Sequence, residues 1–397
     1  MTLTTGLDLD SVLARLPARG DFIVVRDGVR TVVGLEPGAV LRRSGADALR
    51  TLDQLDGWWA GFISYDLGRA IERVPELAAR QPEIPDVLLA RFDARLVLEP
   101  DGTNRVEGDP DAAAAVRALL AAAPRERSSL QLGDWRSNLD RRDFEGAVAQ
   151  ILRHLRDGDC YQVNLTRRLE TDAVVDPVDL FRSIVAGNPA PHAALIRIGD
   201  IAVVSASPER FLRRDRARVE TRPIKGTSSD PALLVASTKD RAENVMIVDL
   251  ARNDLGRVCR YRSVNVPALC TVEQHPGLYH LVSTVTGTLR DGVRTAELIA
   301  AMFPPASVTG CPKPRVLEII ETLEPVRRGV YCGAIGFIDA DNDVLDLSVA
   351  IRTFTLTDGR TYFGVGSGIV ADSDPAAEWE ETELKAARLL SLAAGAD

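Results

Sequence analysis

The sequence predicts an α+β fold in which antiparallel β-sheets are flanked by helices. Two observations carry this prediction. β-rich runs recur in pairs around short turn signals, and segments with one apolar helical face lie between those pairs. Strands joined by short turns must pair antiparallel, because a parallel pair needs a long crossover connection.

Three stretches show the hairpin pattern. "FIVVRDGVRTVV" places Asp27-Gly28 between two β-rich runs, and "RTFTLTDGRTYFGVG" does the same with Asp358-Gly359. Asp-Gly is a favoured sequence for a two-residue hairpin turn. A third candidate is "ALIRIGDIAVVSASPERFLRR", in which Gly199-Asp200 separates two strand-like runs.

Helices are expected at residues 141–159, 238–256, 313–325 and 374–395. The first carries its apolar residues on one stripe and ends in a glycine, as an amphipathic helix does. The last begins with Asp374 as a candidate N-cap and Pro375 at the first helical position, which is the favoured place for proline.

Residues 121–138, "AAAPRERSSLQLGDWRSN", contain the most linker-like composition of the chain. We therefore expect a smaller β-rich region at residues 1–125 and a larger region at 138–397, interwoven into one compact unit. A chain of 397 residues is long enough for one large domain or two to three ordinary ones.

Composition argues against several classes of protein. The net charge of −9 disfavours nucleic-acid binding, which usually needs a basic face. We see neither a signal peptide nor an apolar run long enough to span a membrane. The five cysteines are scattered without a C-x-x-C pair, which indicates reduced thiols and a cytoplasmic location.

The last predicted helix carries Glu378, Glu381 and Lys385 on one face, at spacing i, i+3, i+7. Such a face is most often solvated and held by an ion pair. The preceding "GVGSGIVADSD" favours a binding site instead, because Gly366 and Gly368 allow the backbone to approach a ligand closely.

Glu243 lies among apolar residues of the predicted helix at 238–256. A carboxylate in that setting is either paired or binds a cation. Mg²⁺ prefers oxygen ligands and often takes one or two protein carboxylates together with substrate oxygens. One glutamate from each of two helices would suit such a site.

Three further charged residues stand out. Glu209 follows Pro208 at a strand end and is either a turn charge or, if buried, a general acid. Arg352 lies inside the strand-like "VAIRTF" and needs an anionic partner if buried, for which a substrate carboxylate is suitable. His280, in "YHLVSTVTG", is more typical of a core histidine than of a catalyst.

Lys225 raises a sharper question. It is a long cation at the end of a strand in "VETRPIKGTSSD", between Pro223 and Gly226, in a setting otherwise chosen for backbone shape. A lysine becomes a nucleophile only when desolvation or a nearby cation lowers its pKa.

Taken together, these stretches resemble the chorismate-utilising enzymes, a family that includes anthranilate, aminodeoxychorismate, isochorismate and salicylate synthases. The motifs that follow the family order are "GDCYQVNLTRR", "SPERF", "TRPIKGT", "AENVMIVDLARNDLGRV", "HLVSTVTGTL", "SVTGCPKPRVLEIIETLEPVRRGVYCGAIGF", "AIRTF" and "GSGIVADSDPAAEWEETELKA". The match covers roughly residues 140–390 and 57–76. It implies two large, mostly antiparallel β-sheets packed as a sandwich with flanking helices.

Two positions discriminate within the family. Gln162 stands where the water-adding members have a lysine base, which disfavours isochorismate and salicylate synthases. Lys225 stands in "PIKGT" where anthranilate synthases resemble "PIAGT". The resemblance therefore implies aminodeoxychorismate synthase component I activity, with anthranilate synthase component I or a non-catalytic chorismate-binding paralogue as alternatives.

The resemblance also implies roles for the site residues. Lys225 acts as the nucleophile at C2 of chorismate, and Glu209 protonates the departing C4 hydroxyl. Mg²⁺ is held by Glu243 and Glu381, with Glu378 nearby. The substrate is contacted by Gly226, Thr227, His280, Tyr331, Arg352, Gly366, Gly368 and Lys385.

Ammonia is the second substrate implied by the resemblance. It attacks C4, expels the lysine and gives 4-amino-4-deoxychorismate, on the route to p-aminobenzoate and folate. None of the five cysteines lies in the Gly-rich elbow of a glutaminase nucleophile. We therefore expect a separate glutamine amidotransferase subunit to supply the ammonia.

Overall fold

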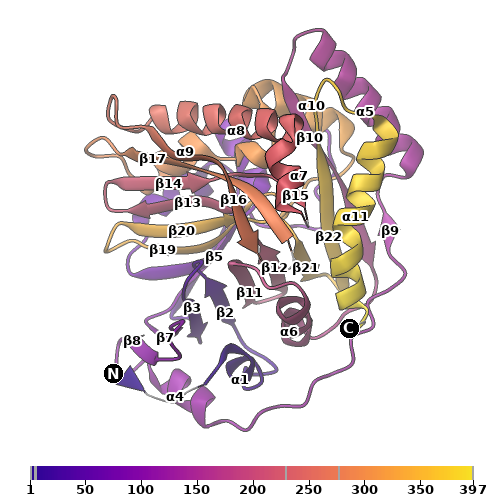
Figure 1. The fold of residues 1–397 in the computed structure, drawn as a ribbon. Helices are drawn as coiled ribbons and strands as arrows, with labels where there is room; N and C mark the ends of the chain where they lie inside the picture. The colour runs from indigo at the N-terminus through magenta and orange to yellow at the C-terminus, as the bar shows by residue number, and fades with distance from the viewer. Residues whose placement is uncertain (1, 4–6, 229, 276–277, 396–397) are drawn as a thin grey trace.

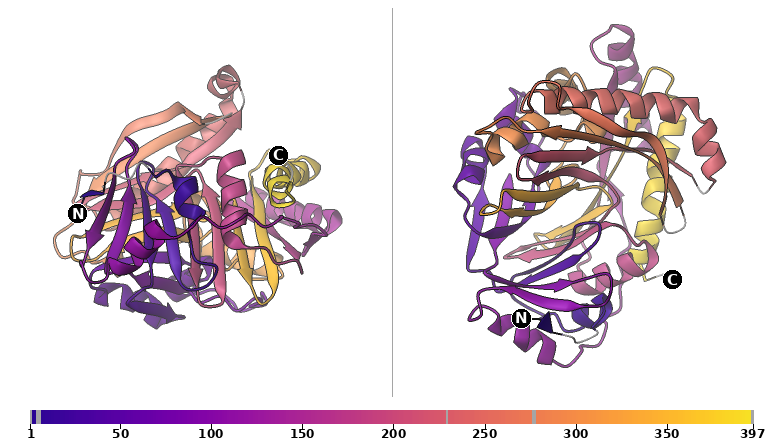
Figure 2. Two further views of the ribbon diagram at one scale, coloured as in Figure 1. Left: turned by 90° about the horizontal axis from the view of Figure 1, so that it is seen from below. Right: turned by 60° about the vertical axis from the view of Figure 1, so that its left-hand side comes forward.

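The fold is an α+β sandwich of two large antiparallel sheets, one of 12 strands and one of 10, as the sequence predicts (Figure 1). The computed structural model describes residues 2–3, 7–228, 230–275 and 278–395. Helices cover the outer faces of both sheets, and the second view in Figure 2 shows the layers. Among the described residues, no helix is long and apolar enough to cross a membrane.

The 12-stranded sheet combines strands from both ends of the chain. Its order is β1 (Thr2–Leu3), β8 (Asn104–Gly108), β7 (Ala94–Leu98), β3 (Thr31–Leu35), β2 (Phe22–Arg26), β11 (His192–Ile198), β12 (Ile201–Ser207), β21 (Thr353–Thr357), β22 (Arg360–Ile369), β10 (Gln162–Thr171) and β18 (Gly310–Cys311), with β9 (Arg136–Ser137) paired to β10.

The 10-stranded sheet also combines strands from early and late parts of the chain. Its order is β15 (Ile224–Ser228), β17 (Leu278–Thr288), β14 (Arg218–Arg222), β13 (Arg210–Asp215), β20 (Val344–Val349), β19 (Ala334–Asp339), β5 (Trp58–Ile63), β6 (Val87–Arg91) and β4 (Ala39–Arg43), with β16 (Asn265–His275) paired to β17. The strands of residues 1–125 thus pair with later strands in both sheets, through β2 with β11 and through β5 with β19.

Two long helices border the region of the candidate site. Helix α8 (Thr238–Gly256) packs on β15, β16 and β17, and α11 (Pro375–Ala393) packs along β22 (Figure 1). The other helices are α1 (Leu9–Leu13), α2 (Ala46–Thr51), α3 (Gly68–Ile71), α4 (Ala114–Ala121), α5 (Arg141–Arg156), α6 (Pro177–Gly187), α7 (Pro231–Ala236), α9 (Thr295–Met302) and α10 (Lys313–Leu323), with 3₁₀ turns at η1 (Leu52–Gln54), η2 (Tyr65–Leu67) and η3 (Ala306–Val308).

Two of the three predicted hairpin turns are confirmed. Asp358-Gly359 joins β21 to β22 with positive φ at both residues, and Gly199-Asp200 joins β11 to β12. The turn of the first hairpin lies one residue further along the chain than predicted. The Asp27 N–H donates to the carbonyl of Arg30, at 3.1 Å, so the β2–β3 ladder continues one residue further and the turn falls at Gly28 and the residue after it.

The core includes three apolar layers and a further apolar cluster where α5 and α10 meet β10. Between the sheets, side chains such as Ile196 and Val203 meet Phe62 and Ile335 from the opposite sheet, all almost fully buried. A second layer lies between the 12-stranded sheet and helices α6 and α11, and a third between the 10-stranded sheet and helices α8 and α9. Burial on both faces explains why many strands lack polar alternation.

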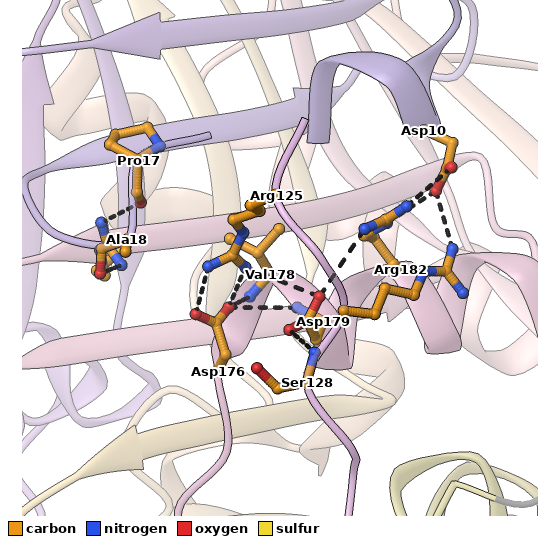
Figure 3. Close-up of polar contacts among 11 residues, drawn as sticks. Asp10, Pro17, Ala18, Arg125, Ser128, Asp176, Val178, Asp179 and Arg182 are labelled. Atoms are coloured by element: carbon orange, nitrogen blue, oxygen red, sulfur yellow. Dashed lines mark hydrogen bonds and ion pairs between the residues drawn. The ribbon is translucent and has the colours of Figure 1, made fainter. Parts of the chain in front are cut away.

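The connection after α4 is tied to α6 by an ion-pair network (Figure 3). Arg125 makes two hydrogen bonds to the carboxylate of Asp176, at 2.8 and 2.6 Å. Asp176 is also the N-cap of α6 and accepts from the backbone N–H groups of Val178 and Asp179. Nearby, Asp179 accepts from the backbone N–H of Ser128 at 2.9 Å.

Replacing Asp176 with alanine should lower the free energy of unfolding by about 2 kcal/mol, because both the helix cap and the partner of Arg125 are lost. Asp176→Asn should cost less than about 1 kcal/mol, since asparagine caps as well as aspartate. Urea denaturation of both variants measures the difference. Equal losses would mean that the ion pair, not the cap, is the main stabilising contact.

Candidate active site

The candidate site lies where β15, β10 and β22 approach helices α8 and α11. Lys225 is on β15, and its side chain is only 13% exposed. A Cβ added to Gly368 on β22 would lie 3.4 Å from Lys225 Nζ and 3.4 Å from Gln162 Nε2. The glycine therefore leaves room for a lysine and an amide on this face of the sheet.

Carboxylates and a second cation surround the Lys225 ammonium. Its Nζ lies 3.9 Å from Glu243 Oε2 on α8. Burial lowers the pKa of Lys225, and the Lys385 ammonium acts in the same direction, while Glu243, Glu209 and Glu381 oppose the shift. The net direction is downward, which is what a lysine nucleophile requires.

Glu209 lies between β12 and β13 and is 5% exposed. Burial raises its pKa to about 7, although a hydrogen bond from the Ser307 hydroxyl and the charge of Lys225 act to lower it. A carboxyl with this pKa is partly protonated at neutral pH and can donate a proton. Sequence reasoning missed Ser307, because η3 reaches Glu209 only through the tertiary fold.

The three glutamates proposed as metal ligands do not share one environment. Burial raises the pKa of Glu243. Burial also acts to raise the pKa of Glu381, but the Lys385 ammonium and the Ser367 hydroxyl outweigh it, so this pKa lies below its usual value. Glu378 accepts hydrogen bonds from Ser367 and, at 2.6 Å, from the hydroxyl of Ser373.

Ser367 joins the two glutamates of α11. Its hydroxyl contacts Glu378 and lies 3.0 Å from Glu381 Oε1. Lys385 then links Glu381, at 2.5 Å, to the carbonyl of Gly366, at 3.1 Å. The sequence "GVGSG" could have indicated Ser367. Side chains alternate along a strand, so the Ser367 side chain must lie on the face opposite to that of Gly366 and Gly368.

The strand register around Lys225 is irregular. A bulge between Lys225 and Thr227 lets Lys225 pair with Leu281 and Thr227 with His280. Gly226 has φ +73°, and a Cβ there would lie 2.9 Å from Asp240 Cγ. Only glycine adopts this conformation without strain, which explains the glycine after the lysine.

His280 is a buried residue of β17 whose Nδ1 lies 2.9 Å from Thr227 Oγ1. This contact holds the imidazole next to the Lys225 strand. Tyr331 lies farther along the sheet, where a Cβ on Gly364 would come within 2.2 Å of its ring. Gly364 is therefore required by the close approach of Tyr331.

Two polar side chains lack the expected kind of partner among the described residues, namely a carboxylate for the half-buried Arg352 and a hydrogen-bond partner for Gln162. Arg352 has φ +54°, and burial lowers the pKa of its guanidinium with no carboxylate opposing the shift. Gln162 is fully buried, and neither its amide nitrogen nor its amide oxygen has a hydrogen-bond partner. Such groups are usually satisfied, so a ligand or ordered water is expected beside them.

The structure thus brings most of the predicted residues together. The pKa of Lys225 is influenced by the charges of four of the others, namely Glu209, Glu243, Glu381 and Lys385. Gly366 and Gly368 line the same place, whereas Glu378 is turned toward two serines and Tyr331 lies farther along β22. Within the described residues, no three His, Cys, Asp or Glu side chains converge as a ready-made metal site.

Comparison with known proteins identifies the class. The chorismate binding enzyme family matches residues 34–391, and the chain belongs to that family. Within it, the chain is 41% identical to aminodeoxychorismate synthase component 1 of Salmonella typhimurium, over 83% of this chain and 75% of that protein. It is 40% identical to the Escherichia coli protein of the same name, over 93% and 85% of the two chains.

Proteins named anthranilate synthase are also similar to this chain in sequence and in structure. The chain is 37% identical to an anthranilate synthase component 1 of Haloarcula marismortui, over 81% of this chain and 73% of that one. The crystal structure of anthranilate synthase component I from Streptococcus pneumoniae superposes with a TM-score of 0.82 at 26% identity, covering 98% of this chain and 99% of the other. The fold inferred from the sequence motifs is therefore confirmed.

A comparison of two arginines tests the unpaired state of Arg352. Arg352→Met should leave the free energy of unfolding unchanged or raise it by about 1 kcal/mol, because a half-buried cation without a carboxylate partner is removed. Arg328→Met should lower it by about 3–5 kcal/mol, since Glu324 would lose the buried partner that now lies 2.7 Å away. A comparable loss for both variants, measured by urea denaturation, would show that Arg352 is paired in solution.

Proposed function

We propose that this chain is the synthase component of an aminodeoxychorismate synthase, which aminates chorismate at C4 with ammonia. The main observation in support is the pair formed by Lys225 and Glu209. Burial lowers the pKa of Lys225 and raises the pKa of the neighbouring Glu209 to about 7. The family membership and the names of its 40–43% identical relatives support the same activity.

In this proposal Glu209 is the proton donor and Lys225 is the nucleophile. Protonated Glu209 gives its proton to the C4 hydroxyl, which leaves as water. The neutral amine of Lys225 attacks C2 and forms a covalent adduct. Ammonia then attacks C4, the bond between C2 and the lysine nitrogen breaks, and the proton lost by the new amine returns to the Glu209 carboxylate. Each group ends in its starting state.

Cations and backbone groups are available for the carboxylates of chorismate. Arg352 lacks a carboxylate partner among the described side chains, so we assign it to a substrate carboxylate. Lys385 lies at Gly366, beside Gly368, where the absence of side chains allows close approach. Thr227 and His280 support the Lys225 strand, while the Gly226 backbone and the Tyr331 ring complete the substrate-binding set.

The donor set also fits Mg²⁺ in part. Glu243 and Glu381 present carboxylate oxygens close enough to influence each other, and Mg²⁺ is commonly bound by one or two protein carboxylates plus substrate. These two residues would hold the ion, and Glu378 would orient Ser367 beside them. The ion would supply positive charge for the ring carboxylate of chorismate.

Ammonia is proposed to come from a separate glutamine amidotransferase. The relatives named component 1 support a two-component arrangement. The five cysteines are free, and burial raises the pKa of Cys160 and Cys259 to about 11, which makes them poor glutaminase nucleophiles. Unpaired thiols also support our proposal of a reducing, cytoplasmic location.

Lys225→Ala should lower the amination rate by at least about a thousandfold and abolish the covalent adduct seen by mass spectrometry. Lys239→Ala is the matched control, because Lys239 also lies near Glu243, at 4.0 Å, but is 57% exposed. An intact adduct in Lys225→Ala would refute the nucleophile assignment. Strong anthranilate fluorescence from chorismate, Mg²⁺ and ammonium without a lyase would instead identify an anthranilate synthase.

The adduct-forming rate should show a bell-shaped pH profile. It rises with pH as Lys225 loses its proton, and it falls above a pH of about 7 as Glu209 loses the proton that it must donate. Glu209→Gln should slow the step by about 10²–10⁴-fold and remove the fall at high pH. Stopped-flow measurements without ammonia isolate this step, and a wild-type rate that stays flat above pH 7 would contradict the role of Glu209.

A further inference from the structure

A cavity lies beside Tyr331, and two of its lining residues, Ile84 and Val330, belong to the apolar layer between the sheets. It is bounded by β10, β21, β22 and the segment at 324–331, and the half-buried Asn138 and Pro82 are at its rim. We call it the Tyr331 cavity. None of the roles assigned above accounts for it.

The Tyr331 cavity and the Lys225 ammonium both lie on the same face of the paired strands β10 and β22. Thr166 and Arg168 on β10 have the same parity as Gln162, so their side chains share the face on which Gln162 meets Gly368. Tyr331 covers Gly364 on that face. From Gly364 to Gly368 is four residues, or about 13 Å of strand, and the Tyr331 ring stands between cavity and site.

The size of the cavity limits what can occupy it. The space open to the centres of water-sized molecules is about 40 Å³. That is enough for about three waters, since one water needs about 10–15 Å³ measured in this way. Chorismate, with its ring and two carboxylates, is far too large, whereas ammonia has the size of water.

The walls favour a neutral molecule with a lone pair. The Nε atoms of Arg168 and Arg327 are buried and have no hydrogen-bond acceptor among the described residues. Ammonia can accept from them, but ammonium, which has no lone pair, cannot. The lining contains four arginines, Arg328 among them, and two carboxylic residues, so the excess positive charge also disfavours a cation.

The two carboxyls do not reverse this preference. Glu324 is paired with Arg328 at 2.7 Å and accepts from a backbone N–H. Burial raises the pKa of Asp66 to about 6, with Arg69 and Arg327 opposing the shift. Neither carboxylate is left to hold an ammonium ion alone.

We propose that the Tyr331 cavity is the passage through which neutral ammonia reaches C4 of the substrate, entering at the rim near Asn138. This inference rests on the proposed amination of chorismate. It places the docking of the ammonia source at the rim of the cavity and makes Tyr331 the last barrier before the reacting carbon.

Filling the cavity tests the passage. Thr355 lines the cavity and lies opposite Tyr362 in the β21–β22 ladder, outside the proposed catalytic set. Thr355→Phe should lower kcat/KM for ammonia, assayed with ammonium chloride, by about tenfold or more. The KM for chorismate and the rate of adduct formation without ammonia should not change. Thr355→Leu adds less bulk and should show a smaller loss.

Thr357→Phe is the matched control, because Thr357 is a buried threonine on the same face of the same strand that does not line the cavity. An unchanged kcat/KM for ammonia in folded, adduct-forming Thr355→Phe and Thr355→Leu would overturn the passage. So would an equal loss in Thr357→Phe. A wild-type protein that forms neither adduct nor aminated product would instead refute the proposed function itself.

Discussion

The exclusion of water from the Lys225 ammonium is the constraint on which the rest of the site depends. Burial is the largest influence on the pKa of this lysine, and it acts against three carboxylates that would otherwise hold the proton. Because a glycine faces the ammonium, the sheet itself can form one wall of the pocket. The same burial keeps Glu209 partly protonated near neutral pH. Burial thus favours the uncharged form of both groups, a neutral amine at Lys225 and a protonated carboxyl at Glu209.

The architecture makes this burial possible. Lys225 on β15 of one sheet reaches Gly368 on β22 of the other, and helices α8 and α11 pack on these two strands. The glycines of β22 serve two purposes on one face, since Gly364 admits Tyr331 and Gly368 admits Lys225, while Ser367 on the opposite face holds the carboxylates of α11. Alternation along a single strand therefore places the two glycines on the face of Tyr331 and Lys225, and the Ser367 hydroxyl on the face of α11.

Local chemistry made much of this predictable from the sequence. Turn residues located the hairpins, and the N-cap Asp374 with Pro375 located the start of α11. The hairpin at Asp27 was misplaced by one residue, because a longer ladder, not the Asp-Gly pair alone, decided where the turn falls. Ser307 and the Tyr331 cavity could not have been found, since both arise where distant segments meet and neither leaves a periodic signal.

The choice of nucleophile follows from what the buried site can and cannot do to water. Gln162 Nε2 and Lys225 Nζ both lie 3.4 Å from the position of a Cβ on Gly368, and the amide of Gln162 cannot remove a proton from water at neutral pH. In the proposed reaction, water in this pocket therefore stays a weak nucleophile, even though loss of the C4 hydroxyl would release one molecule of it. Ammonia needs no such activation once it is neutral. If Lys225 attacks C2, as we propose, only the amide of Gln162 is left beside it, and such a site favours a nucleophile that arrives already deprotonated.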